Sequence, residues 1–166
     1  MEIERKFLVK HLPHNLEDYP CRQIEQAYLC NNPVVRIRHM EDELILTYKS
    51  GGMMARQEVE LPLNQSAYEH LKAKADGTII SKKRYILPLS DHLKIELDIF
   101  EGMLKGFIMA EVEFPSLEEA NNFVPPSWFL LDVTYDSDFH NSNLSKMQEE
   151  QRLAFLKKIE QISSLS

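Results

Sequence analysis

The chain opens with Met1-Glu2-Ile3-Glu4-Arg5-Lys6-Phe7-Leu8-Val9, in which charged and apolar side chains alternate. Side chains of a β-strand point alternately to its two faces. One face of such a strand carries Glu2, Glu4 and Lys6, and the other face carries apolar side chains. This face carries two carboxylates and an ammonium group in one row. The question is whether it meets bulk water or an enclosed, ligand-filled interior.

The same alternation recurs along most of the sequence. Alternation and turn residues predict strands over 2–10, 22–30, 34–40, 43–50, 56–62, 79–88, 92–100 and 107–114. The charged faces of these strands carry Glu2, Glu4, Lys6, Arg36, Arg38, Lys49, Arg56, Glu58, Glu60, Lys82, Arg84, Lys94, Glu96, Asp98, Glu111 and Glu113. Nearly every predicted strand therefore has one apolar face and one face of paired charges.

Three segments have the pattern of helices. They span 66–75, 117–124 and 144–163. Asn64 or Ser66 caps the first, and Ser116 with Glu119 forms a capping box at the second. Gln151 interrupts the apolar stripe of the third.

The charged faces have two explanations. Most antiparallel sheets have one solvated face, which is the ordinary explanation. A solvated face, however, is usually rich in Ser, Thr, Asn and Gln, whereas this one is almost purely charged. Three helices that pack on the apolar face from outside would turn the charged face inward. We therefore expect an α+β, mostly β fold, a closed eight-stranded antiparallel barrel with flanking helices, since about eight strands enclose one small ligand. We expect one domain over 1–166.

Composition narrows the classes of function. The net charge of −7 disfavours a nucleic-acid binder. No apolar run reaches the roughly 20 residues that cross a bilayer, and no signal-peptide pattern precedes the first strand, so the expected location is the cytoplasm. We expect Cys21 and Cys30 to be free thiols, His140 and the other histidines to lie at the surface, and the protein to be a monomer or homodimer.

A closed interior of this kind suits a particular ligand. Arginine forks and lysine ammonium groups bind phosphate oxygens. Carboxylates repel phosphate, but beside those cations they suit Mg²⁺ or Mn²⁺, hard ions that also accept phosphate oxygens as ligands. The mixed charge therefore predicts a metal-bound polyphosphate as the ligand.

The motifs resemble one known family, the CYTH proteins or triphosphate tunnel metalloenzymes. Glu2-Ile3-Glu4-Arg5-Lys6 resembles the ExExK signature of the family. Further matches follow in order at Gln26-Ala27-Tyr28-Leu29, Val35-Arg36-Ile37-Arg38, Thr47-Tyr48-Lys49-Ser50, Arg56-Gln57-Glu58-Val59-Glu60, Lys82-Lys83-Arg84-Tyr85, Glu96-Leu97-Asp98 and Glu111-Val112-Glu113-Phe114. The late segment 135–140 departs from the pattern, since it lacks a basic residue that is often expected there.

The resemblance implies a divalent-metal-dependent triphosphatase that hydrolyses inorganic triphosphate or a related compound. The phosphate ligands implied by the match to the family motifs are Lys6, Arg36, Arg38, Lys49, Arg56 and Arg84. The implied metal ligands are Glu2, Glu4, Glu111 and Glu113. The match gives Lys82 the role of transferring a proton to the leaving group. Four further carboxylates either take part in binding or only orient the cationic side chains. They are Glu58, Glu60, Glu96 and Asp98. Two alternatives stay open, an adenylyl cyclase of the same family and a non-catalytic polyphosphate-binding module. The like charges of Lys49 and Arg84 are expected to lower the pKa of Lys82.

Overall fold

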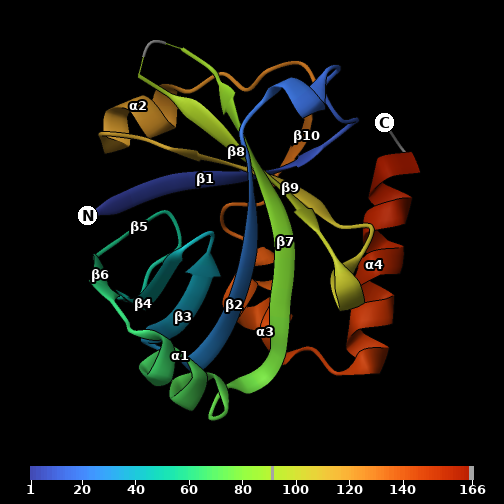
Figure 1. Ribbon diagram of the computed structural model, residues 1–166. Helices are drawn as coiled ribbons and strands as arrows, with labels where there is room; N and C mark the ends of the chain where they lie inside the picture. Colours follow the sequence, from blue (N-terminus) through green and yellow to red (C-terminus); the bar gives the residue numbers. More distant parts are fainter. Residues whose placement is uncertain (91, 165–166) are drawn as a thin grey trace.

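Antiparallel strands dominate the computed structural model, which describes residues 1–90 and 92–164 (Figure 1). The strands are β1 (Glu2–Val9), β2 (Cys21–Asn31), β3 (Val34–Met40), β4 (Glu43–Lys49), β5 (Ala55–Arg56), β6 (Glu58–Pro62), β7 (Asp76–Pro88), β8 (Lys94–Phe100), β9 (Ile108–Glu113) and β10 (Phe129–Asp132). The predicted strands are all present, and the expected mostly β fold is confirmed. The number of strands differs, with ten in the described residues where eight were expected.

Two differences account for the extra strands. The predicted strand 56–62 is interrupted at Gln57, which separates β5 from β6. The four-residue β10 follows Pro125-Pro126 and has no clear alternation of its own. It is a strand because it pairs with β1, where Phe7 lies opposite Asp132. Pairing with a partner far away in the sequence cannot be recognised from so short a segment.

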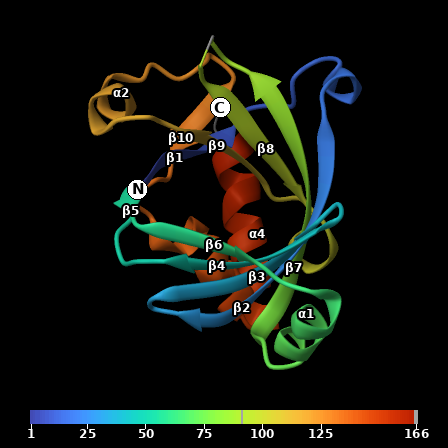
Figure 2. The ribbon, with the colours of Figure 1, turned by 60° about the vertical axis from the view of Figure 1, so that its left-hand side comes forward.

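The sheet curls until its two ends nearly meet. Its strand order is β10-β1-β9-β8-β7-β2-β3-β4-β6, and β5 pairs with β1 outside this path. Arg56 lies opposite Glu2, and Ala55 lies opposite Ile3. Because β5 and β6 are one residue apart, this segment joins β4 on one side to β1 on the other. Figure 2 shows the strands surrounding an opening, as a nearly closed barrel.

Within residues 1–90 and 92–164, four α-helices and three short 3₁₀ helices connect or follow the strands. The α-helices are α1 (Gln65–Lys72), α2 (Leu117–Asn122), α3 (Asn141–Lys146) and α4 (Glu149–Ser164), and the 3₁₀ helices span Leu16–Asp18, Gly102–Leu104 and Ser137–Phe139. The Asn64 and Ser116 side chains accept hydrogen bonds at the starts of α1 and α2, which confirms both caps. The predicted helix 144–163 is in fact two helices. Gln151 accepts a hydrogen bond from the backbone N–H of Gln148, which is the reciprocal half of a capping box and starts α4.

Helices α1 and α2 cover the outer, apolar face of the barrel, as expected. Tyr68 of α1 packs against Ala27 and Ile37 of β2 and β3. Ala120 of α2 packs against a larger cluster that includes Val112 of β9. Figure 1 shows the two helices on opposite sides of the strands. Burial of each large apolar side chain contributes roughly 1.5–3 kcal/mol, so these contacts hold the charged face inward.

Helices α3 and α4 do not cover the outer face, and this part of the prediction was wrong. Instead they pack against residues that share the inward parity of the charged side chains. We call this cluster the apolar plug, and it consists of Leu8, Ile80, Phe100 and Met109 from the strands with Phe139, Leu144, Phe155 and Ile159 from the C-terminal segment. In Figure 2, α4 lies behind the opening that the strands surround. The inner face therefore changes from charged to apolar along the barrel, and the plug closes one end.

The remaining expectations concern the cysteines and the membrane. Cys21 and Cys30 both lie in β2 and both are free thiols, as predicted. Among the described residues, no helix has the length and apolar character needed to span a membrane.

Candidate active site

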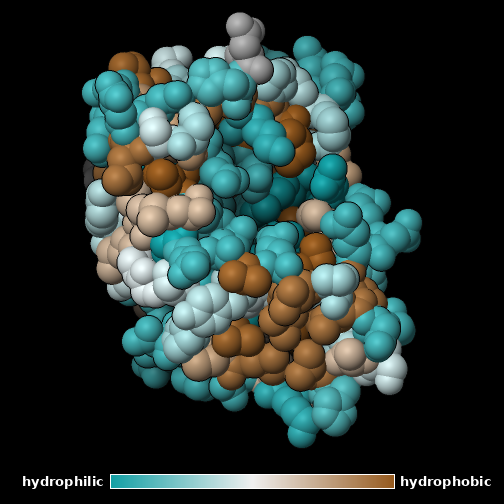
Figure 3. Space-filling view, turned by 90° about the vertical axis from the view of Figure 1, so that its left-hand side faces the viewer, coloured by the Kyte–Doolittle hydropathy of each residue, from teal (hydrophilic) through white to brown (hydrophobic). Residues whose placement is uncertain are grey.

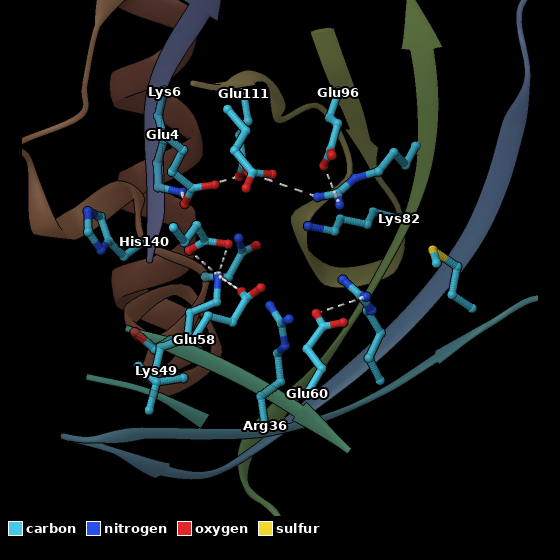
Figure 4. Close-up of a pocket in the computed structure, with 18 of the residues that line it drawn as sticks. Glu4, Lys6, Arg36, Lys49, Glu58, Glu60, Lys82, Glu96, Glu111 and His140 are labelled. Atoms are coloured by element: carbon cyan, nitrogen blue, oxygen red, sulfur yellow. Dashed lines mark hydrogen bonds and ion pairs between the residues drawn. The ribbon is translucent and has the colours of Figure 1, made fainter. Parts of the chain in front are cut away.

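The predicted site residues come together in one cavity of about 280 Å³ inside the barrel. We call this cavity the lumen, and its walls include Glu2, Glu4, Lys6, Arg36, Arg38, Lys49, Arg56, Glu58, Glu60, Lys82, Arg84, Glu96, Glu111 and Glu113. Asp98 is the one predicted residue that does not line it, because it is fully buried behind Lys82 and Arg84. Figure 4 shows the labelled side chains extending toward one space from strands on opposite sides. On the surface this space is a hydrophilic hollow (Figure 3).

Two arginines of β3 provide positive charge, and of the two only Arg38 has a carboxylate of the described residues within ion-pair distance. No carboxylate among the described residues lies within ion-pair distance of Arg36, whose Nη2 donates a 3.4 Å hydrogen bond to Thr47. The Nη2 of Arg38 is 3.7 Å from Glu60. The Nε atoms of both arginines are buried and have no hydrogen-bond partner in the part of the chain that the structure describes. Burial and the neighbouring guanidinium groups lower the pKa of Arg38. Buried N–H donors without acceptors are costly, so this wall is suited to bind an anion.

The lysines of β1 and β4 are held by carboxylates. Nζ of Lys6 is 2.6 Å from Oε1 of Glu4 and 3.3 Å from Oε1 of Glu111. Nζ of Lys49 is 2.8 Å from Oε1 of Glu2 and 3.3 Å from Oε2 of Glu58.

Neighbouring carboxylates keep the side chain of Lys6 in its charged ammonium form. Although burial opposes its charge, the carboxylates of Glu111 and Glu4 raise the pKa of Lys6. It remains a cation at any physiological pH.

Lys82 and Arg84 of β7 share one buried carboxylate. Nζ of Lys82 is 2.6 Å from Oδ2 of Asp98, while Nε and Nη2 of Arg84 make a two-pronged contact with the same carboxylate at 2.7 and 2.9 Å. Nη1 of Arg84 also lies 2.5 Å from Glu96. Burial lowers the pKa of Lys82 to about 8 even though Asp98 favours its charge. The direction agrees with the prediction, but burial is the main cause, and Arg84 contributes less.

The carboxylates of β1 and β9 supply oxygen donors on the wall opposite β3. Glu2, Glu4 and Glu111 are paired with cations, and no group of three or more acidic, histidine or cysteine side chains in the described residues is already arranged around a metal position. Glu113 is different, because it lies exposed at the end of β9 and forms no ion pair with a described residue. Burial and the nearby Glu2 and other carboxylates raise its pKa. Oxygen donors that repel one another fit a hard divalent cation.

Several polar residues of the lumen were not predicted as site residues. The expectation that His140 lies at the surface was wrong, because it is 7% exposed and lines the lumen. Its Nε2 lies 3.3 Å from the carbonyl oxygen of Thr134, and burial together with Lys6 lowers its pKa. In Figure 4 it stands at the edge of the charged cluster. Arg22 and Lys94 also line the lumen, and their inward parity was a signal that could have identified them.

Comparison with known proteins places the chain in a family. No protein-family profile matches the sequence. An inorganic triphosphatase of Nitrosomonas europaea is 37% identical over 145 residues, which are 87% of this chain and 96% of that protein. The chain belongs to the CYTH, or triphosphate tunnel, family. An inorganic triphosphatase of Acetivibrio thermocellus is 31% identical over 149 residues, covering 87% of this chain and 93% of the other.

Solved structures agree with this membership of the triphosphate tunnel family. A crystal structure of an inorganic triphosphatase matches with a TM-score of 0.67 and 34% identity, over 89% of this chain and 96% of that one. A structure from Hippeastrum, described as a putative adenylyl cyclase with a dominant triphosphatase activity, matches with a TM-score of 0.54 at 17% identity. It covers 73% of this chain and 83% of the other. At that identity the second match shows the shared fold alone.

Proposed function

We propose that the protein is a divalent-metal-dependent triphosphatase that hydrolyses inorganic triphosphate, or a closely related triphosphate, in the lumen. One observation carries the proposal. The Nε atoms of Arg36 and Arg38 are buried and lack acceptors among the described residues, and the wall they form faces strands that carry a row of carboxylates. The 37% identical inorganic triphosphatase supports the same reaction.

The residues have distinct roles in this proposal. Phosphate oxygens are bound by Lys6, Arg36, Arg38, Lys49, Arg56 and Arg84. Mg²⁺ or Mn²⁺ is held by Glu2, Glu4, Glu111 and Glu113. The cationic side chains are oriented by Glu58, Glu60, Glu96 and Asp98. The metal, when bound, neutralises charge on the phosphate oxygens. Lys6 is paired with Glu4, and Lys49 is paired with Glu2. A phosphate that attracts these ammonium groups would free carboxylate oxygens to hold the metal.

The chemical step is the hydrolysis of one phosphoanhydride bond. A water oxygen bonds to a terminal phosphorus atom, the bond to the bridging oxygen breaks, and phosphate and pyrophosphate are the products. Phosphoryl transfer depends mostly on positioning and charge neutralisation. The Lys82 ammonium group, held by Asp98, donates a proton to the departing oxygen. We also propose a cytoplasmic location for a monomer or homodimer, and the free thiols of Cys21 and Cys30 support that location.

The test distinguishes a triphosphatase from a cyclase and from a non-catalytic binding module. Purified protein is incubated with Mg²⁺ or Mn²⁺ and inorganic triphosphate, ATP or thiamine triphosphate, and phosphate, pyrophosphate and cyclic AMP are measured separately. We expect phosphate without cyclic AMP, and no activity in Glu4→Gln, which excludes a contaminating phosphatase. Pyrophosphate with cyclic AMP would show a cyclase instead. Tight triphosphate binding without turnover would show a binding module.

A further inference from the structure

The lumen has a closed end, where its charged wall meets the apolar plug. Lys6, Lys82 and Glu111 form the charged layer next to the plug on β1, β7 and β9. The next inward position of each of these strands belongs to the plug, and these positions are Leu8, Ile80 and Met109. A triphosphate that enters from the opposite end therefore directs one terminal phosphate at the plug.

Three consecutive residues bring polar groups to this closed end. His140, Asn141 and Ser142 line the lumen, and they lie in the sequence between Phe139 and Leu144 of the apolar plug. The segment joins the 3₁₀ helix Ser137–Phe139 to the first turn of α3. The plug thus offers hydrogen-bonding groups to whatever occupies the end of the lumen.

The geometry of phosphoryl transfer makes this end important. The attacking and leaving oxygens lie roughly in line, on opposite sides of the phosphorus atom. The leaving oxygen of a terminal phosphate belongs to the bridge toward the middle of the triphosphate. A water that attacks the phosphate at the closed end therefore approaches from the side of the plug, where His140 lies.

The hydrogen bond of His140 decides which ring nitrogen is free to accept. Its Nε2 atom lies 3.3 Å from the carbonyl oxygen of Thr134. A carbonyl oxygen only accepts hydrogen bonds, so Nε2 carries the proton and Nδ1 of the neutral ring is an acceptor. The hydroxyl of Thr134 accepts from the backbone N–H of Lys6 at 3.0 Å and donates to Asp132, which fixes the segment that holds the ring.

The surroundings of His140 favour its neutral form. Burial is the main cause that lowers its pKa, and the cations Lys6 of β1 and Arg56 of β5 lower it further. Glu4 of β1 and the hydrogen bond to Thr134 act in the opposite direction without compensating. A neutral imidazole is able to take up a proton from water.

Asn141 supplies a second acceptor beside His140. Its Oδ1 atom is buried and has no hydrogen-bond partner within residues 1–90 and 92–164. A buried acceptor without a donor is costly. A water molecule that donates one hydrogen bond to this oxygen and one to Nδ1 of His140 satisfies both acceptors and turns its lone pairs away from them.

The carboxylates nearest the closed end are less suited to accept a proton from water. Glu4 and Glu111 contact Nζ of Lys6 at 2.6 and 3.3 Å, and both are proposed metal ligands. Among the described residues, His140 contributes the one imidazole that lines the lumen.

We propose, on the basis of the proposed function, that His140 is the general base that activates the attacking water at the closed end of the lumen. The water oxygen bonds to the terminal phosphorus while one of its protons passes to Nδ1 of His140. The bond from phosphorus to the bridging oxygen breaks, and that oxygen receives a proton from Lys82. The imidazolium and the neutral amine then exchange protons with solvent.

The test compares proton uptake with phosphate binding. His140→Asn keeps a polar group near the position of Nδ1 but cannot take up a proton, and His140→Lys places a cation there. His39→Asn is the matched control, because His39 is exposed on β3 and does not line the lumen. Steady-state kinetics with Mg²⁺ give kcat and KM for inorganic triphosphate, and calorimetry gives the Kd for triphosphate without metal.

We expect both His140 variants to lower kcat by at least about hundredfold, which is the smallest usual contribution of a general base. His140→Asn should keep KM and the metal-free Kd within about threefold of the wild type, and His39→Asn should change none of these constants. If His140→Asn is unfolded at the assay temperature, His140→Gln is measured in its place with the same expectations.

The outcomes that overturn the inference are distinct from those that overturn the proposed function. If the wild type does not hydrolyse inorganic triphosphate, the proposed function itself fails. If the wild type is active and His140→Asn loses less than about hundredfold in kcat, this inference alone is overturned. A rise in KM and Kd at an unchanged kcat would show that His140 binds phosphate. Full activity in His140→Lys would show that only a positive charge is needed, which also overturns the inference.

Discussion

Nζ of Lys82 lies 2.6 Å from Oδ2 of Asp98, and both side chains are almost completely excluded from solvent. The pair stands at the boundary between the lumen and the barrel wall, because Lys82 lines the lumen and Asp98 does not. Two opposing effects meet in this one contact. The carboxylate favours the ammonium form of Lys82, while burial disfavours it and lowers its pKa to about 8. The site thereby holds a lysine that changes its charge near neutral pH.

The first prediction concerns the pH dependence of Lys82. Below its pKa of about 8 the free enzyme carries the ammonium form, which can donate a proton, and above it the neutral amine cannot. We therefore expect kcat/KM to fall as pH rises through about 8, since kcat/KM reports the free enzyme. Bound phosphates favour the ammonium form, so the corresponding fall in kcat comes at higher pH. Steady-state kinetics across pH 6–10 measure both.

Lys82→Arg is the control for that profile. Arginine stays protonated, so this variant is expected to bind triphosphate, to turn it over slowly and to lose the inflection. Lys82→Ala is expected to lower kcat more than affinity. A rate that rises through pH 8 in the wild type, or an unchanged profile in Lys82→Arg, would contradict a role in proton donation.

The second prediction concerns the stability that Asp98 provides. Asp98→Asn leaves Lys82 and Arg84 without their shared buried counter-charge. Loss of one partner from a buried ion pair costs about 3–5 kcal/mol, and we expect the free energy of unfolding to fall by that order. Glu60→Gln is the matched control. Its contact with Arg38 is long and partly exposed, so we expect a change of less than about 1 kcal/mol. Urea denaturation measures the free energy of unfolding of both variants. Equal losses would contradict the conclusion that Asp98 stabilises the fold as a buried counter-charge.

The third prediction separates binding from folding at Arg36. No described carboxylate pairs with it, so Arg36→Ala removes little that stabilises the folded protein. The loss of a charge-assisted bond to phosphate costs about 1.5–3 kcal/mol, which is roughly a 10- to 150-fold rise in KM for triphosphate. Lys72→Ala removes a cation from the outside of the barrel, where it pairs with Glu25, and is expected to leave KM unchanged. A large fall in melting temperature with an unchanged KM would mean that Arg36 is structural.

The fourth prediction concerns metal binding at Glu113. Burial and neighbouring carboxylates raise its pKa, which means that the ionised form is repelled in the folded protein without metal. Glu113→Gln removes this repulsion, so we expect the metal-free melting temperature to stay the same or rise. The Mg²⁺ concentration for half-maximal activity should rise at least about tenfold, because a carboxylate ligand is lost.

Two measurements complete that prediction. Calorimetry with Mn²⁺ alone tests the metal affinity of Glu113→Gln without reference to turnover. Glu118→Gln is the control, because Glu118 is exposed on α2 and does not line the lumen. A normal metal requirement in Glu113→Gln would remove this residue from the metal site.

Some features followed directly from the sequence. Period-two alternation identified the inward residues of β1, β3, β7, β8 and β9, because the parity of a strand does not depend on its partners. The caps of α1 and α2 were also predictable, because an N-cap involves only residues three positions apart.

Other features depended on distant contacts. The strand β10 exists through its pairing with β1, and the break between α3 and α4 lies within the segment 144–163 that has the pattern of one helix. His140 lies in the lumen because the chain turns inward after β10, which no local pattern indicates.

The sequence by itself thus determined which side chains share a charged face and what chemistry that face suits. Only the tertiary structure decided that the face closes around a lumen and that α3 and α4 plug one end. It also decided that Lys82 pairs with a carboxylate, whereas Arg36 pairs with none among the described residues. The physical reason is that alternation is a local property of the backbone. Barrel closure, burial and charge pairing arise between strands brought together from distant parts of the chain.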